Sequence, residues 1–147
     1  MNTIADFKQC VILKLQSHFT KRLTVEAYPE TPQAAEDYTF MDSGGAILVQ
    51  FAGRPKQGLT PSSSLKSVRF YLTFLLPSLA GETPVEDLIE ETEVLFHQWW
   101  PCRDFPELVT VGGPASLDEP RFVWRTKDTW QYQANLTIPN IPFPIGE

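Results

Sequence analysis

The sequence predicts an α+β domain with a single mostly antiparallel β-sheet flanked by two α-helices, in the order α-β-β-β-α-β-β-β. Residues 3–19 and 84–99 repeat apolar side chains every three or four positions, which is typical of amphipathic helices. Other segments alternate apolar and polar side chains with a period of two, as half-buried strands do. Gly- and Pro-rich stretches separate these segments, so the order of elements follows from the chain.

The first helix, over residues 3–19, is expected to bury an apolar stripe. The stripe consists of Ile4, Phe7, Val11, Leu15 and Phe19. Three strands are then expected near residues 23–28, 46–52 and 68–76. Between the last two, residues 53–65 are rich in Gly, Pro and Ser, which predicts a long mobile loop.

The second helix has a clear start signal. Thr83 is a suitable N-cap, Pro84 suits the first turn, and Glu86 completes a capping box. We expect the helix to run to about Trp99 and to stop before Pro101. Its exposed side is acidic and contains Glu86, Asp87, Glu90, Glu91 and Glu93.

The last strands are expected near residues 108–111 and in a hairpin over 121–138. One side of the final strand is apolar, and the other side consists of Gln131, Gln133, Asn135 and Thr137. Buried amides cost much less than buried charges, so this uncharged side suits a surface that another protein covers. Residues 139–147 contain so much Pro that we expect an extended C-terminal arm rather than a strand.

Composition limits the class of protein. A chain of 147 residues fits one domain, here residues 1–147. The net charge of −6 argues against a protein that grips nucleic acid. No apolar run is long enough to predict a membrane span, and the first residues lack the pattern of a secretory signal. We therefore expect Cys10 and Cys102 to be reduced, although sequence alone leaves a disulfide open.

No pattern predicts catalytic chemistry. Ser43 lies in an Asp-Ser-Gly-Gly sequence, as in one class of serine protease, but no fitting histidine partner accompanies it. The Cys and His residues lack the close pairs of a structural zinc site. We predict no catalytic residue, no metal and no cofactor, and keep a small serine hydrolase as a remote alternative.

The loop after the second strand is basic within an acidic protein. We predict that it contacts a partner through Arg54, Lys56, Gln57, Leu59 and Lys66. A solvated loop without a partner is the alternative interpretation.

Taken together, these segments resemble the tail terminator family of long-tailed phages, in particular its Mu-like contractile members. The resemblance covers nearly the full chain. It rests on the N-terminal helix, the VQFAGRPK and KSVRFYLTFLL segments, the capped TPVEDLIEETEVLF helix, the strand containing Trp130 and Tyr132, and the Pro-rich end.

The resemblance implies a non-enzymatic homohexameric ring in the virion, assembled in the host cytoplasm. Such a ring caps the head-proximal end of the tail tube and, in contractile tails, of the sheath. It stops polymerisation, lets DNA pass without sequence-specific binding, and provides the surface to which neck or connector proteins attach. A head–tail connector or tail completion protein is the main alternative. No membrane contact is expected.

Overall fold

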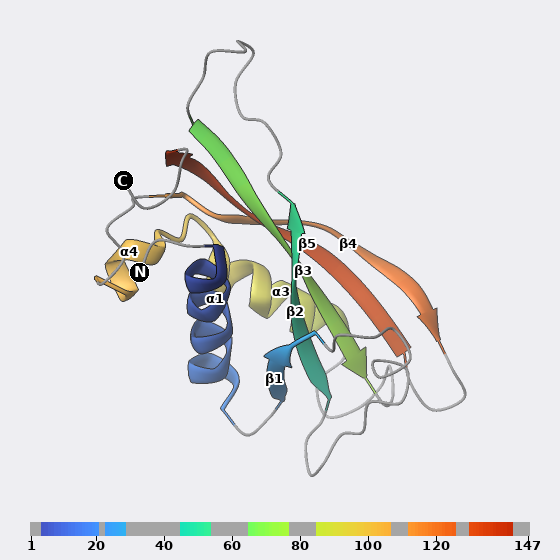
Figure 1. The fold of residues 1–147 in the computed structure, drawn as a ribbon. Helices are drawn as coiled ribbons and strands as arrows, with labels where there is room; N and C mark the ends of the chain where they lie inside the picture. The colour runs from blue at the N-terminus through green and yellow to red at the C-terminus, as the bar shows by residue number, and fades with distance from the viewer. Residues whose placement is uncertain are drawn as a thin grey trace.

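The computed structural model describes residues 4–20, 23–28, 45–53, 65–76, 85–106, 112–125 and 130–142. Figure 1 shows their elements, and the predicted α+β class is confirmed. The helices are α1 (Ile4–Phe19), α3 (Val85–Phe96) and α4 (Pro101–Asp104). The strands are β1 (Thr24–Ala27), β2 (Ala46–Gly53), β3 (Leu65–Leu76), β4 (Ser116–Arg125) and β5 (Trp130–Pro142).

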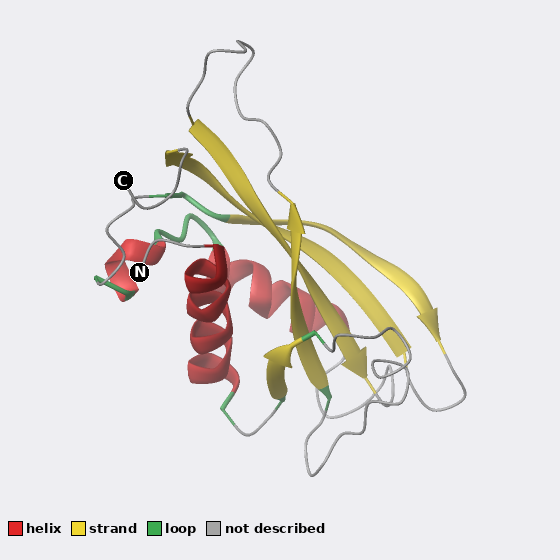
Figure 2. Ribbon diagram, viewed as in Figure 1, coloured by secondary structure: helices red, strands yellow, loops and turns green. Residues whose placement is uncertain are grey.

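The described strands form one five-stranded sheet in the order β1-β2-β3-β5-β4. β1 pairs with β2 in parallel, and all other neighbours are antiparallel. At the centre, Leu72 of β3 lies between Val49 of β2 and Ala134 of β5. The sheet is therefore mostly antiparallel, as predicted, and β4 forms one of its edges (Figure 2).

The main core lies between the sheet and the helices. Alternate residues of β3 and β5 point into it, and so do the buried stripe of α1 and Leu88 and Phe96 of α3. α1 packs against β1 and β2, whereas α3 lies closest to β4. A second, small cluster of Ala46, Leu48 and Leu75 lies on the opposite side of the sheet, and no described helix contributes to it.

The second helix ends earlier than predicted. It stops at Phe96, and a turn follows in which Gln98 has a positive φ of 49°. Trp99 then forms a β-bridge with Ala115 and is buried outside any helix. Pro101, predicted only to end the helix, instead begins α4, because proline is well suited to a first helical turn. The capping residues Thr83 and Pro84 lie outside the described residues.

The prediction of an extended arm from residue 139 is wrong for residues 139–142, which belong to β5. A register shift opposite Lys66 and Val68 accommodates Pro139 and Asn140, and Asn140 has a positive φ of 62°. Prolines are tolerated at such irregularities because no ladder hydrogen bond is required there. The Asn140 side chain also donates to the Gly113 carbonyl at 2.9 Å, which ties this part of the strand to the preceding turn.

Several predictions fall outside the described residues. These are the mobile loop between β2 and β3 (residues 54–64), the strand at 108–111, and the chain end at 143–147. Cys10 and Cys102 form no disulfide within the described part of the chain, and Cys10 is buried in the core.

The Asp104 carboxylate links α4 to α1 and to Trp99. Asp104 Oδ2 accepts a hydrogen bond from Lys14 Nζ at 2.9 Å and another from Trp99 Nε1 at 2.8 Å. Lys14 also lies over the Trp99 ring, 5.1 Å from its centroid. Both hydrogen bonds lower the pKa of Asp104 below its ordinary value of 3.8, and the bond from Lys14 has the larger effect.

This pKa shift predicts an acid-dependent contribution to stability. A lowered folded-state pKa stabilises the fold above the ordinary carboxyl pKa, and the contribution is lost as the pH falls through the folded-state value. The Asp104 side chain is about half exposed, so we expect about 1 kcal/mol or less. Urea unfolding at pH 6 and at pH 3 should show that Asp104→Asn loses stability mainly at pH 6. Asp118→Asn, on β4, is the matched control, and an equal pH-dependent loss there would contradict the assignment.

Candidate interaction surface

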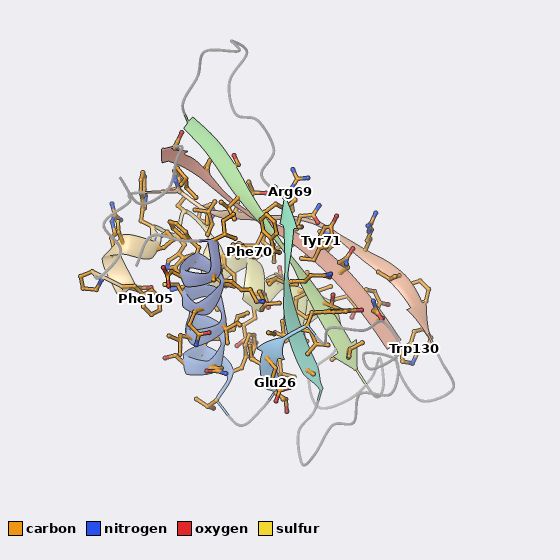
Figure 3. All side chains as sticks on the ribbon, in the orientation of Figure 1. Glu26, Arg69, Phe70, Tyr71, Phe105 and Trp130 are labelled. Carbon is orange, nitrogen blue, oxygen red and sulfur yellow. The ribbon has the colours of Figure 1, made fainter. Side chains whose placement is uncertain are left out.

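The side of the sheet opposite the helices, here called the open face, carries the predicted polar row of β5. Its part around Leu48, Thr73 and Leu75 is already buried within the single chain. In Figure 3, Phe70 points toward the helices, whereas Arg69 and Tyr71 lie on the other side of β3. The register places alternate residues of four strands on this face. The described polar side chains of these four strands on this face include Gln50, Arg69, Tyr71, Thr73, Ser116, Asp118, Arg121, Gln131, Gln133, Asn135 and Thr137, and β1 adds Thr24 and Glu26.

The polar row of β5 lies in the middle of this face, between β3 and β4. Gln133, Asn135 and Thr137 are half-buried, and Gln131 is only 6% exposed. Gln131 is therefore already covered within a single chain and offers the least surface to a partner. The other three side chains are partly exposed, so the predicted contact row is accessible over most of its length.

Charged side chains flank the uncharged row on both sides. Arg69 of β3 is paired in register with Thr137. On β4, Asp118 is opposite Asn135, and Arg121 is opposite Gln133, to which its Nη2 donates a hydrogen bond at 3.1 Å. The face therefore offers uncharged hydrogen-bonding groups at its centre and a few charges around them, as protein interfaces commonly do.

Two polar atoms of β3 on this face have no hydrogen-bond partner among the described residues. They are Nε of Arg69 and Oγ1 of Thr73, and both are buried. A buried donor without a partner costs about 1–3 kcal/mol, so such groups are uncommon in folded chains. No ion pair of Arg69 occurs within the described ranges either.

The edge strand β4 exposes apolar side chains as well as charged ones. Phe122 and Val123 of β4 are 50% and 40% exposed. The Phe122 ring packs against Trp130 and Tyr132 of β5, with centroid distances of 5.9 Å and 5.4 Å. These contacts hold Phe122 in place while leaving half of its surface accessible.

The predicted contact residues of the basic loop lie almost entirely outside the described residues. Arg54, Lys56, Gln57 and Leu59 lie outside the described residues. The backbone of Lys66 pairs with Ile141 in the sheet, and its side chain is not described.

The sequence prediction missed Arg69, Tyr71, Asp118 and Arg121 as members of the same surface. The alternation in β3 was visible and already placed Arg69, Tyr71 and Thr73 on one side of that strand. The pairing of β3 with β5, rather than with its sequence neighbour β4, was not visible. This pairing places the arginine of β3 beside the amide row.

The described residues contain no group of three or more Cys, His, Asp or Glu side chains that could hold a metal ion. Two of the Cys and His residues weighed as zinc ligands have other surroundings: Cys10 is buried, and His18 Nε2 lies 2.8 Å from Glu91 Oε1. Ser43 lies outside the described residues. None of the described helices is long and apolar enough to cross a membrane.

Comparisons with known proteins support the fold without identifying a function. No protein-family model and no curated protein matches the chain. A solved structure, whose name states no function, shares the fold with a TM-score of 0.51 and 15% sequence identity. The match covers 95% of this chain and 92% of that chain, so it extends across the whole domain.

Proposed function

We propose that this protein is a non-enzymatic phage tail terminator, acting as a homohexameric ring at the head-proximal end of the tail tube. The observation that carries the proposal is the half-buried, uncharged row of Gln133, Asn135 and Thr137 on an open sheet face. A surface of this kind can be covered by protein without the large cost of burying unpaired charges. The family resemblance of the sequence supplies the type of assembly.

The two sides of the domain differ in character, which suits a ring. The open face carries amides and two described arginines, whereas the outer side of α3 is acidic. When one surface contacts a different surface of the next copy, the contact is heterologous, and it closes into a ring if the rotation closes. The same asymmetry would allow one ring face to bind the last tube ring while the other face does not bind further tube subunits.

The net charge of −6 also fits a ring through which DNA passes. Like charges repel, so an acidic protein has little affinity for the phosphate backbone. Sequence-specific DNA binding is not part of the proposal. The proposed partners are other copies of the chain, the tube and sheath proteins, and the neck or connector proteins, within a virion assembled in the host cytoplasm.

The direct test is a tube-growth assay with the tail tube protein of the same phage. Adding the purified chain during polymerisation should shorten the tubes, and negative-stain electron microscopy should show an added ring at one end only. Tubes of unchanged length with bare ends would contradict the proposal. A ring that does not bind tubes but binds connector complexes would favour the head–tail connector alternative instead. If the protein shows a hydrolytic activity and Ser43→Ala abolishes it, the result would favour the alternative of a small serine hydrolase.

A further inference from the structure

Arg69 is the least satisfied charged group on the open face. Its side chain is half-buried, its Nε is fully covered, and no described residue accepts a hydrogen bond from it. Arginine presents a planar fork of donors that matches a carboxylate. Asp118 of β4 and Glu26 of β1 are the described carboxylates on the same face, and one strand separates each of them from β3. No described carboxylate of this sheet lies beside Arg69, so the accessible part of its guanidinium can pair with a carboxylate of another chain.

The outer side of α3 offers carboxylates in a regular arrangement. Glu86, Glu90 and Val94 follow one another at four-residue spacing, so they form one stripe along the helix. The stripe lies opposite the buried residues Leu88 and Phe96 and points away from the core. Val94 is 73% exposed, an unusual setting for a large apolar residue within an acidic surface.

The spacings of the two surfaces match. Four residues of a helix advance about 6 Å, and two residues of a strand advance about 6.6–6.8 Å. Glu90 and Val94 can therefore contact Arg69 and Tyr71 at the same time, with the carboxylate on the guanidinium and the valine on the ring. α3 packs on the other side of its own sheet, so this contact requires a second copy.

We propose that the α3 stripe of one copy docks on the Arg69–Tyr71 pair of the next copy, with Glu90 forming an ion pair with the accessible part of the Arg69 guanidinium. The contact joins two different surfaces and is heterologous, as a ring requires. This inference rests on the proposed ring and names the two surfaces that form it.

The test reverses the charges separately and then mixes the two variants. Arg69→Glu and Glu90→Lys should each weaken self-association about a hundredfold, because each leaves like charges facing one another. In an equimolar mixture, a ring in which the two variants alternate has two kinds of contact. One joins Glu90 to Arg69, as in the wild type, and the other joins the lysine of Glu90→Lys to the glutamate of Arg69→Glu. Native mass spectrometry should therefore show hexamers with three copies of each variant.

Three further variants control this experiment. Lys8→Glu on α1 and Glu26→Lys on β1, which β2 separates from β3, make the same changes of charge away from the Arg69–Tyr71 pair and the α3 stripe, and should associate like the wild type. Val94→Glu alters an exposed helix position without touching the core, so it should weaken association about a hundredfold with unchanged thermal unfolding. This variant keeps the test informative even if substitution of Arg69 disturbs folding.

Two results would overturn the inference. The first is a ring that caps tubes in all variants alike, which would refute the two surfaces while leaving the proposed function in place. The second is a mixture that fails to recover association although both variants are folded. A wild-type chain that stays single both in solution and on tubes would refute the ring itself, and with it the inference.

Discussion

Replacing Phe74 with alanine is expected to lower the free energy of unfolding by about 3–5 kcal/mol, the usual cost of removing a buried phenylalanine. Phe74 is fully buried in the main core and lies in register between Ile47 of β2 and Tyr132 of β5. Three neighbouring strands therefore lose contacts at once, and little can move in to fill the space. Urea unfolding followed by circular dichroism measures the change.

Phe122→Ala is the matched control for this prediction. It removes the same ring from the edge strand β4, where half of the side chain is already exposed. We expect a loss of about 1 kcal/mol, most of it from the contacts with Trp130 and Tyr132. Equal losses at the two positions would mean that the helix-facing core is not where the structure places it.

Asn135→Asp is expected to prevent ring formation while leaving the single chain folded. The two side chains have nearly the same shape, so the change introduces a negative charge at the centre of the open face. There it would lie opposite Asp118 of β4, close to where the acidic α3 of the next copy is proposed to dock. An unpaired charge buried at an interface commonly costs 2–5 kcal/mol, which corresponds to a loss of association of about thirtyfold or more.

Gln9→Glu is the control for this second prediction, because it makes the same change from amide to carboxylate on the exposed side of α1. Sedimentation velocity should show that Gln9→Glu associates like the wild type and that Asn135→Asp sediments as a single chain. Thermal unfolding of Asn135→Asp should change little, since like charges opposite one another in a sheet cost about 1 kcal/mol or less. Unaltered association of Asn135→Asp would show that this face is not covered.

The helices and strands were predictable because their signals are local. The apolar stripe of α1 and the alternation in β3 and β5 are each set by the periodicity of one segment. Tertiary contacts decided what local patterns could not. Trp99 leaves the helix to pair with Ala115, and Pro139 remains in a strand because a register shift accommodates it.

The candidate surface was predictable only in part. The uncharged row of β5 was evident from one strand, but the burial of Gln131 depends on its neighbours in the sheet. The position of Arg69 beside Thr137 depends on the order β3-β5-β4, in which the last two strands exchange places relative to the chain. No periodicity within one segment encodes such an order, so the place of Arg69 on this surface could be established only from the structure.

The central claim is that copies of this chain assemble with one another and act by capping a filament. Mass photometry of the purified chain, alone and after release from the ends of tail tubes, tests it most directly. A hexamer would appear as a particle of about 100 kDa, six times the 16.7 kDa of one chain, in the material released from tubes. A single 16.7 kDa chain in both samples, or no chain bound to tubes at all, would contradict it.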